Sequence, residues 1–272
     1  MRQFVASASP ASPLTSPLPW PAGDAAPAAA RWLAADLPRV EAQLALDEAL
    51  LDEAHAGRLS GPVVRTWMAA EPTVVVGSSS RIDEEVDRAA CGRAGVRIVR
   101  RPSGGLTVVL GPGCVMWSVV APLPPESPPP ITRLHEAMLD PLAAALVSAG
   151  RPVVRRGSSD LAVCDAAGER KVSGNALRVR RGGVLYHGTL LDAFDLGLIS
   201  RLLRHPPREP DYRARRDHAS FLANLGLGRS ALDAAVREAF AAREPLADWP
   251  ADQVAGLVRD RYDSVAWTER TA

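Results

Sequence analysis

The sequence predicts an α+β (mixed α/β) fold in which a mixed, mostly antiparallel central β-sheet is flanked by helices. Short runs of β-branched residues, bounded by glycine and proline, are typical of strands joined in hairpins. Longer stretches between them repeat apolar residues every three or four positions, as amphipathic helices do. Strands and helices do not alternate regularly, so a parallel βαβ array is not expected. The 272 residues suffice for one large domain with a small appendage.

Helices are expected at six places. The longest is 132–149, where Leu134, Met138, Leu142 and Leu146 form one apolar stripe. The others are 44–54, 83–94 (ended by Gly95), 194–203, 230–242 (with Ser230 as its N-cap) and 251–262.

Strands are expected where β-branched residues cluster between turn signals. These segments are 62–68, 72–76, 96–99, 107–110, 114–120, 153–155, 161–164, 171–177 and 184–191. Glycines at 168, 174, 182 and 183 are interpreted as tight hairpin turns. The proline-rich segment 122–130 and the arginine-rich segment 206–218 are expected to be irregular. We hypothesise that Asp211, Tyr212, Arg213 and Arg216 cover a functional site.

Charge and cysteine usage exclude several classes of protein. The 32 basic and 31 acidic residues leave a formal net charge of +1, too little for nucleic acid to be expected as a partner. The three cysteines, Cys91, Cys114 and Cys164, have no disulfide or zinc spacing and suggest a reducing compartment, which favours the cytoplasm. No apolar run approaches the roughly 20 residues of a membrane span, so no membrane is expected.

The chain is expected to divide into three parts. Residues 1–30 are rich in alanine and proline and are expected to form a disordered leader. Residues 31–250 are expected to form the catalytic domain. Residues 251–272 are expected to be a C-terminal helix and tail, without an accessory domain.

The first motif that indicates chemistry is the loop 100–105, with the sequence RRPSGG. Its two glycines, Gly104 and Gly105, let the backbone approach a ligand closely. Arg100 and Arg101 offer planar donors for phosphate or carboxylate oxygens, and Ser103 adds a hydroxyl. The Gly-Lys-Ser/Thr ending of a Walker loop is absent.

The second and third motifs are KVSGNA at 171–176 and HGTLL at 187–191. Because side chains alternate along a strand, Lys171, Ser173 and Asn175 are expected on one face. Lysine is rare in this arginine-dominated chain, which suggests that position 171 needs a compact charge. Gly188, beside His187, permits close approach to an apolar ligand.

Together the three motifs resemble the superfamily of lipoate–protein ligase, octanoyltransferase and biotin–protein ligase catalytic domains, with lipoate–protein ligase A most similar. The resemblance covers about residues 40 to 245. It includes the segments 44–48 (LALDE), 74–77 (VVVG) and 160–163 (DLAV). It implies the fold of a biotin/lipoate ligase catalytic domain.

The resemblance also implies an activity: ATP and Mg²⁺ activate lipoate or octanoate as an acyl-adenylate, and a lysine of a carrier domain accepts the acyl group. Lys171 would be the catalytic residue, contacting the acyl carbonyl and the phosphate. The acyl group would be bound by Arg101, Ser103, Gly104, Gly105, Thr107, His187, Gly188 and Thr189. The nucleotide would be bound by Arg100, Asp160, Ser173, Gly174 and Ala176, with Asp160 also holding Mg²⁺.

The implied partners are lipoyl carrier domains, of the 2-oxoacid dehydrogenase E2 or glycine cleavage H protein type. A separate protein that carries the accessory domain is a further implied partner. The sequence departs from the ligase pattern at four places: Ser78, Leu106, Leu110-Gly111 and Ser159. These positions lie beside the predicted acyl and nucleotide sites.

Two further hypotheses stay open at this point. One is an ATP-independent octanoyl or lipoyl transferase that acts on carrier proteins. It would be cysteine-independent or otherwise unusual, because such enzymes resembling this chain form a cysteine thioester at one of two characteristic positions, and segments 151–159 and 192–272 contain no cysteine. The other is a non-catalytic subunit that binds acyl-carrier domains.

Overall fold

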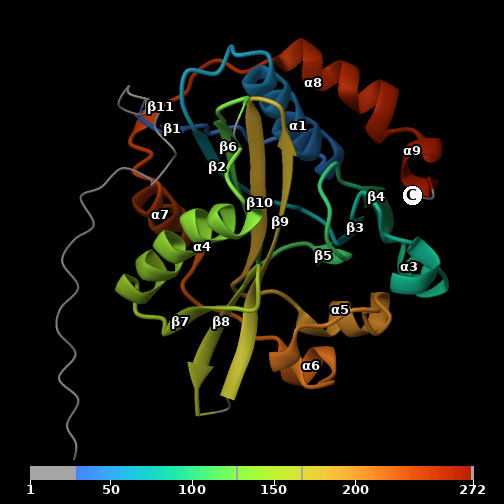
Figure 1. Cartoon of the computed structure of the whole chain (residues 1–272). Helices are drawn as coiled ribbons and strands as arrows, with labels where there is room; N and C mark the ends of the chain where they lie inside the picture. Colours follow the sequence, from blue (N-terminus) through green and yellow to red (C-terminus); the bar gives the residue numbers. More distant parts are fainter. Residues whose placement is uncertain (1–28, 127, 167, 271–272) are drawn as a thin grey trace, which may run out of the picture.

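The computed structural model describes residues 29–270 apart from 127 and 167 (Figure 1). Residues 1–28, most of the predicted leader, lie outside the described residues. In chain order the strands are β1 Arg31–Trp32, β2 Val63–Met68, β3 Thr73–Val76, β4 Arg97–Arg100, β5 Val108–Leu110, β6 Cys114–Pro122, β7 Val153–Arg156, β8 Asp160–Asp165, β9 Gly168–Arg180, β10 Gly183–Leu191 and β11 Glu244–Pro245. The helices are α1 Val40–His55, α2 Ile82–Glu85, α3 Arg88–Ala94, α4 Ile131–Ser148, α5 Leu196–Leu202, α6 His218–Phe221, α7 Arg229–Ala239, α8 Ala251–Leu257 and α9 Val265–Glu269, with a 3-10 turn at Asp211–Arg213 and a π-helical turn at Val258–Tyr262.

Two sheets organise these elements. The main sheet has the strand order β11-β1-β2-β6-β10-β9-β8-β7, and the small sheet has the order β4-β3-β5. In the main sheet the pairs from β2 to β7 are antiparallel, and the short edge pairs of β1 are parallel. The prediction of a mixed, mostly antiparallel sheet flanked by helices is therefore confirmed. The runs 62–68 and 72–76, adjacent in sequence, belong to different sheets.

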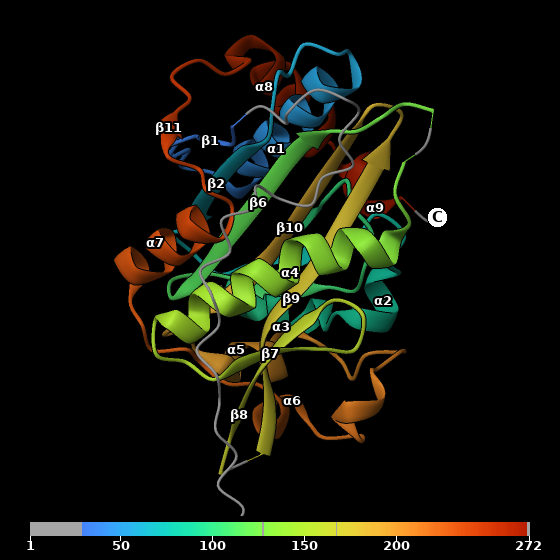
Figure 2. The same ribbon diagram turned by 60° about the vertical axis from the view of Figure 1, so that its left-hand side comes forward.

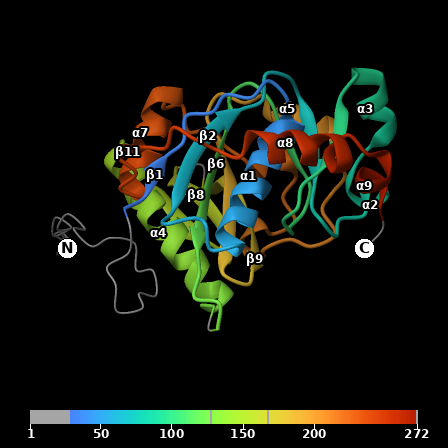
Figure 3. The ribbon, with the colours of Figure 1, turned by 90° about the horizontal axis from the view of Figure 1, so that it is seen from above.

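The main sheet separates two apolar cores. Helices α4 and α7 cover one face (Figure 2), whereas α1, α8 and the small sheet lie on the other (Figure 3). Strand β6 shows why: Val115, Trp117 and Val119 pack toward α4 and α7, while Cys114 and Met116 pack toward α1. This alternation with a period of two is what a strand buried on both faces requires.

Two local predictions were wrong for reasons of tertiary packing. The predicted helix 83–94 is broken into α2 and α3, because Val86 is extended, fully buried and bridged to Leu203. Asp87 then caps α3 by accepting a hydrogen bond from the Ala90 amide at 2.8 Å. Ser230 is not the N-cap of α7, which begins one residue earlier after Gly228.

Two of the predicted glycine turns need correction as well. Gly174 lies inside β9, opposite Asp160, and Gly183 is the first residue of β10. Gly168 and Gly182 have φ angles of 93° and 81° at the strand ends, where a tight turn favours glycine. The strand β9 is therefore longer than the predicted segment 171–177.

The C-terminal segment packs onto the rest of the fold. Tyr262 is buried and donates a hydrogen bond to Glu48 of α1 at 2.7 Å. The indole of Trp267 donates to the carbonyl of Arg100 at 2.9 Å. The segment 251–270 therefore contacts both α1 and the start of the RRPSGG loop. None of the helices in the described part of the chain has the length and hydropathy needed to cross a bilayer.

A buried ion pair fastens α1 to the main sheet. Asp47 of α1 and Arg65 of β2 are 1 % and 0 % exposed, and Arg65 Nη1 lies 2.9 Å from Asp47 Oδ1. The same carboxylate oxygen accepts a hydrogen bond from Ser118 of β6 at 2.9 Å. Burial alone would raise the pKa of Asp47, but the Arg65 cation and contacts with His187 and Ser118 lower it. Asp47 is therefore an ionised group that the fold has enclosed.

We expect Asp47→Asn to lower the free energy of unfolding by about 3–5 kcal/mol, because it leaves the Arg65 cation buried without an opposite charge. Urea denaturation followed by circular dichroism measures this loss. Glu84→Gln is the matched control, since Glu84 pairs with Arg81 at the exposed surface. That change should cost about 1 kcal/mol or less. Equal stability losses in the two variants would contradict a structural role for the buried pair.

Candidate active site

A cavity of about 470 Å³ lies where the two sheets face each other, and its size is typical of a small-molecule site. Its apolar wall comes from α1 and both sheets and includes Leu44, Val75, Val108, Leu110 and Met116. Its polar groups are Arg101, Thr107, Ser158, Ser159, Asp160, Lys171, Asn175, His187, Thr189, Arg208 and Glu209. The lining of the cavity thus combines an apolar wall with charged and polar groups.

Lys171 reaches this cavity because β9 contains a bulge. Leu161 pairs with Ser173, but the next residue of β8, Ala162, pairs with Lys171, so Val172 is the extra residue. The bulge turns Lys171 away from the buried Ser173 and onto the face of Gly174. A Cβ on Gly174 would lie 3.0 Å from the Lys171 ammonium. The prediction that Lys171, Ser173 and Asn175 share one face was therefore wrong.

Lys171 is held by Asp160, which Tyr212 supports in turn. Its Nζ lies 2.8 Å from Asp160 Oδ1, and the other carboxylate oxygen accepts a hydrogen bond from the Tyr212 hydroxyl at 2.9 Å. Burial and then the neighbouring Asp160 raise the pKa of Tyr212, so this hydroxyl remains a donor. Lys171 is also the only lysine in the sequence. A single ammonium is thus fixed at a defined point of the cavity.

Arg101 holds the RRPSGG loop (residues 100–105, below also called the glycine loop) in its conformation from the inside. Its guanidinium donates to the carbonyls of Gly104 at 2.6 Å, Leu106 at 2.9 Å and Val75 at 3.2 Å. Burial lowers the pKa of this guanidinium to about 10, so the group is still charged at neutral pH. The carbonyls satisfy its donors but do not neutralise the charge. An anion in the cavity would therefore be attracted to this wall.

His187 is oriented by a chain of buried groups. Its Nε2 lies 2.5 Å from the hydroxyl of Ser103, and its Nδ1 lies 3.6 Å from Oδ2 of Asp47. Ser103 is fully buried and does not line the cavity, whereas His187 does. The ion pair between Asp47 and Arg65 thereby extends to the cavity wall. This arrangement fixes the imidazole ring but leaves Ser103 inaccessible as a nucleophile.

A second cavity of about 150 Å³ adjoins the first, and the two share Leu106, Thr107, Lys171, Gly174 and Thr189 among their lining residues. Four cations surround this second cavity: Lys171, Arg204, Arg208 and Arg213. Among its described lining residues the single carboxylate is Glu85, which accepts hydrogen bonds from the Thr107 amide and hydroxyl, both at 2.7 Å. Lys171 and Arg213 also pair with Asp160 and Glu209, so the region beside Lys171 keeps an excess positive charge of about one.

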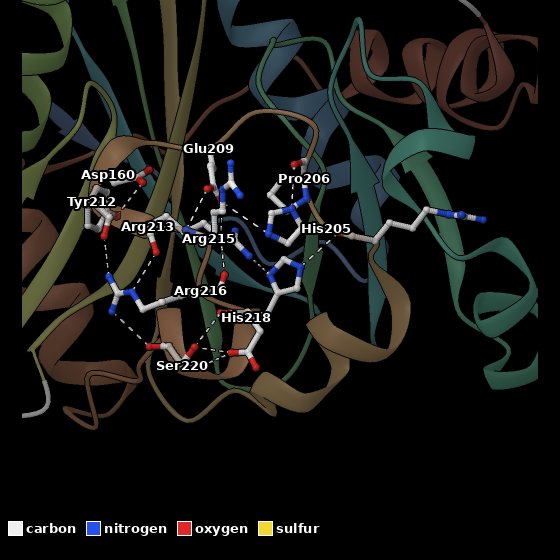
Figure 4. A network of polar contacts seen from close by, with 12 residues as sticks. Asp160, His205, Pro206, Glu209, Tyr212, Arg213, Arg215, Arg216, His218 and Ser220 are labelled. Atoms are coloured by element: carbon white, nitrogen blue, oxygen red, sulfur yellow. Dashed lines mark hydrogen bonds and ion pairs between the residues drawn. The ribbon is translucent and has the colours of Figure 1, made fainter.

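The segment 204–220 forms one wall of these cavities through its own polar network (Figure 4). Tyr212 points toward Asp160, while Arg216 donates to the Tyr212 carbonyl at 2.8 Å. Arg213 pairs with Glu209 at 3.4 Å, and its guanidinium lies 4.8 Å from the ring centroid of Phe221. These contacts give an irregular segment a defined position against Lys171.

The structure brings together most of the predicted site residues. Those that line the first cavity are Arg101, Gly105, Thr107, Asp160, Lys171, Gly174, Ala176, His187, Gly188 and Thr189. Four others do not line it: Ser103 and Ser173 are fully buried, Gly104 lies on the far side of the loop, and Arg100 is directed elsewhere. Arg100 donates to the carbonyls of Gly77, Ser80 and Thr268 at 2.7–2.9 Å.

Several groups of the site were missed from sequence. Met116, Arg208 and Glu209 line the cavity, although no local motif singles them out. Tyr212 belongs to the segment that the sequence predicted to cover the site, and it reaches the site through its hydrogen bond to Asp160. Asp47 stood within the matched segment 44–48 without an assigned role. An acidic pair inside an apolar helical stretch is a signal for it, since both Asp47 and Glu48 are buried.

The cysteines lie away from the cavities. None of the three lines either cavity. Cys91 and Cys114 are buried, and burial raises the pKa of the Cys114 thiol to about 12. Cys164 lies on β8 four residues beyond Asp160, roughly 13 Å along the strand. No thiol is therefore positioned to attack a ligand beside Lys171.

The chain is similar to a known protein family and to a member of the same superfamily. Residues 39–242 match the family model of the lipoyl protein ligase A/B catalytic domain. The octanoyltransferase LipM of Carboxydothermus hydrogenoformans is 30% identical over 259 residues, which are 84% of this chain and 93% of that protein.

Solved structures of similar fold include the bipartite lipoate protein ligase of Thermoplasma acidophilum, with a TM-score of 0.77 at 23% identity over 89% of this chain and 96% of that one. A lipoate-protein ligase A bound with ATP has a TM-score of 0.74 at 22% identity, covering 89% of this chain and 98% of that one. With its three motifs gathered around one cavity and three quarters of its length matched, the chain belongs to the lipoyl protein ligase A/B catalytic domain family.

Proposed function

We propose that this protein attaches a lipoyl or octanoyl group to a lysine of a carrier domain and activates the free acid with ATP. The observation that carries the proposal is the cavity itself: a single ammonium, that of Lys171, stands between an apolar wall and a cationic region, and no cysteine lines it. An apolar wall suits a medium-chain acid, and a cationic region suits phosphates.

The acyl chain would lie against Leu44, Val75, Leu110 and Met116, which belong to the apolar wall of the first cavity. Its carboxylate would then meet Lys171, with the charged Arg101 in the wall. Gly105, Thr107, Gly188 and Thr189 would provide the close approach that a narrow chain needs. Of the other predicted acyl-binding residues, Ser103 would act only through His187, which it contacts.

The nucleotide phosphates would bind beside Lys171, where Arg204, Arg208 and Arg213 line the second cavity. Gly174 and Ala176 would leave room along β9 for the nucleotide. Asp160 and Glu209 are the carboxylates that line the first cavity, and such oxygens suit Mg²⁺ when phosphates complete its shell. Mg²⁺ would supply charge neutralisation on the phosphates there.

In the proposed first step, an oxygen of the acyl carboxylate bonds to the α-phosphorus of ATP, and pyrophosphate leaves. In the second step, the amine of the carrier lysine bonds to the acyl carbonyl carbon, AMP leaves, and the amine loses a proton. Both steps build negative charge on oxygens near Lys171. Its ammonium would exchange Asp160 for those oxygens, an effect typically worth a factor of about 10²–10³ in rate.

The transferase hypothesis is the second candidate, and the relative named octanoyltransferase LipM favours it. A thioester route needs an accessible thiolate beside the ligand. Cys91 and Cys114 are buried, and Cys164, which is half-buried, lines neither cavity. A non-catalytic carrier-binding subunit is the third candidate.

We propose lipoyl carrier domains of the E2 or H-protein type as the acceptors. We also propose a cytoplasmic setting, because the sparse cysteines suggest a reducing compartment.

Lys171→Ala should reduce pyrophosphate release by about 10²–10³-fold while the protein stays folded, because the developing charge loses its donor. The assay contains the purified chain, ATP, Mg²⁺ and lipoic or octanoic acid, with and without an apo carrier domain. Lys171→Arg is the matched variant that keeps the charge but not the compact ammonium. Adding the separate accessory-domain protein tests whether that partner is required.

Release that depends on the acid and on Lys171 supports the ligase. Acyl transfer from an octanoyl-carrier thioester without ATP would replace it with the transferase. Carrier binding without any product, in the presence of the accessory protein, would replace both with the non-catalytic subunit.

Cys164→Ser should leave the rate of acyl attachment unchanged, because its thiol lies outside the cavity and beside Arg156 and Glu169. The measurement is mass spectrometry of the modified carrier domain over time. Cys91→Ala serves as the second thiol control in the same experiment. An inactive Cys164→Ser protein with native circular dichroism would revive the thioester route.

A further inference from the structure

A third cavity lies on the far side of the RRPSGG loop, away from the first cavity, which we call the acyl cavity. Its volume is about 400 Å³, and Pro102, Gly104 and Trp267 form part of its wall. Three arginines line it: Arg178 from β9, and Arg261 and Arg270 from the C-terminal segment. We name these residues the arginine basin.

The arginine basin carries excess positive charge. Among the described residues one carboxylate meets these arginines: Glu48, which pairs with Arg178 at 3.1 Å and also with Arg261. Arg270 has no carboxylate within ion-pair distance in the described part of the chain, and it donates a hydrogen bond to the carbonyl of Ser78 at 3.0 Å. Burial and then the charges of Arg261 and Arg178 lower the pKa of Arg270. Three cations facing one buried carboxylate leave the basin about two charges positive.

The guanidinium groups are held in place rather than free in solvent. Trp267 lies between two of them, with its ring centroid 3.6 Å from Arg270 Cζ and 4.7 Å from Arg261 Cζ. Arg178 donates to the carbonyl of Pro102 at 3.3 Å. Preorganised guanidiniums with unused donors form two-point hydrogen bonds to phosphate oxygens. The basin therefore has the chemistry of a phosphate site.

The position of the basin links it to the acyl cavity. Gly174, Ala176 and Arg178 lie on one face of β9, because side chains alternate along a strand. Gly174 and Ala176 line the acyl cavity, and Arg178 begins the basin roughly 7 Å farther along the strand. The glycine loop separates the two. A ligand with an acyl end and a phosphate end could contact both.

We propose that the arginine basin is a second binding site, separate from the catalytic cavity, and that it takes a phosphate group. Two sources have this chemistry: a nucleotide, and the phosphopantetheine end of an acyl thioester. The choice between them rests on the proposed function, whereas the existence of the phosphate site does not.

The test uses inorganic pyrophosphate as the probe and the full chain as the receptor, with titration calorimetry at low salt. Arg270→Gln should weaken binding roughly tenfold, the effect of losing one charge-assisted hydrogen bond. Arg259→Gln is the matched control, because Arg259 lies on the same C-terminal segment but pairs only with the exposed Asp260 among the described residues. It removes the same charge and should leave the Kd unchanged.

The fluorescence of Trp267 gives an independent readout, taken as the difference between the full chain and Trp267→Phe. Pyrophosphate should change this signal in the full chain, and Arg270→Gln should need roughly tenfold more pyrophosphate for the same change. The proposal is overturned if binding does not saturate, or if Arg270→Gln and Arg259→Gln weaken it equally. Lys171→Ala should retain the Trp267 response, so a failed ligase assay and a failed basin are told apart.

Two further titrations identify the source. If Arg270→Gln weakens the binding of ATP but not that of pantetheine 4′-phosphate, the basin binds a nucleotide. The reverse pattern assigns it to a phosphopantetheine arm. Loss of both supports a general phosphate site, and loss of neither overturns the proposal.

Discussion

The buried ion pair between Asp47 and Arg65 connects the core to the candidate active site. Its carboxylate joins helix α1 to strands β2 and β6 and approaches the ring of His187. Ion pairs of this kind are costly to desolvate and are weak evidence of stability by themselves. Their geometry, however, has few alternatives once the charges are enclosed. Here the pair aligns α1, the sheet and the imidazole of His187, which in turn contacts the glycine loop through Ser103.

The glycine loop has a different means of support. Arg100 and Arg101 are both buried, and both guanidiniums donate to backbone carbonyls. Arg101 folds the loop around itself, while Arg100 ties its beginning to the segment after β3 and to the C-terminal segment. The two adjacent arginines therefore support the loop from different sides: Arg101 lies in the wall of the first cavity, and Arg100 lies behind that wall. The loop therefore faces a cavity on each side: Gly105 lines the first cavity, and Gly104 lines the arginine basin.

The overall composition does not show how unevenly charge is distributed in this protein. The formal net charge is only +1, yet cations gather around the second cavity and again in the arginine basin. The first cavity, which adjoins the second, adds an apolar wall. This arrangement suits an amphiphilic substrate, with apolar and anionic parts. It also suits a family whose name refers to lipoyl groups and their attachment to proteins.

The sequence by itself determined the fold class, most strands and the three motifs, because alternation, helical periodicity and glycine turns are local properties. Through the family resemblance it also predicted Lys171 and His187 as site residues, and both line one cavity. Tertiary structure decided the rest. Packing broke the helix at Val86, and the bulge at Val172 placed Lys171 on the cavity face. The contacts of Tyr212 with Asp160 and of Arg270 with Trp267 join segments far apart in the chain, and no local pattern encodes such pairings.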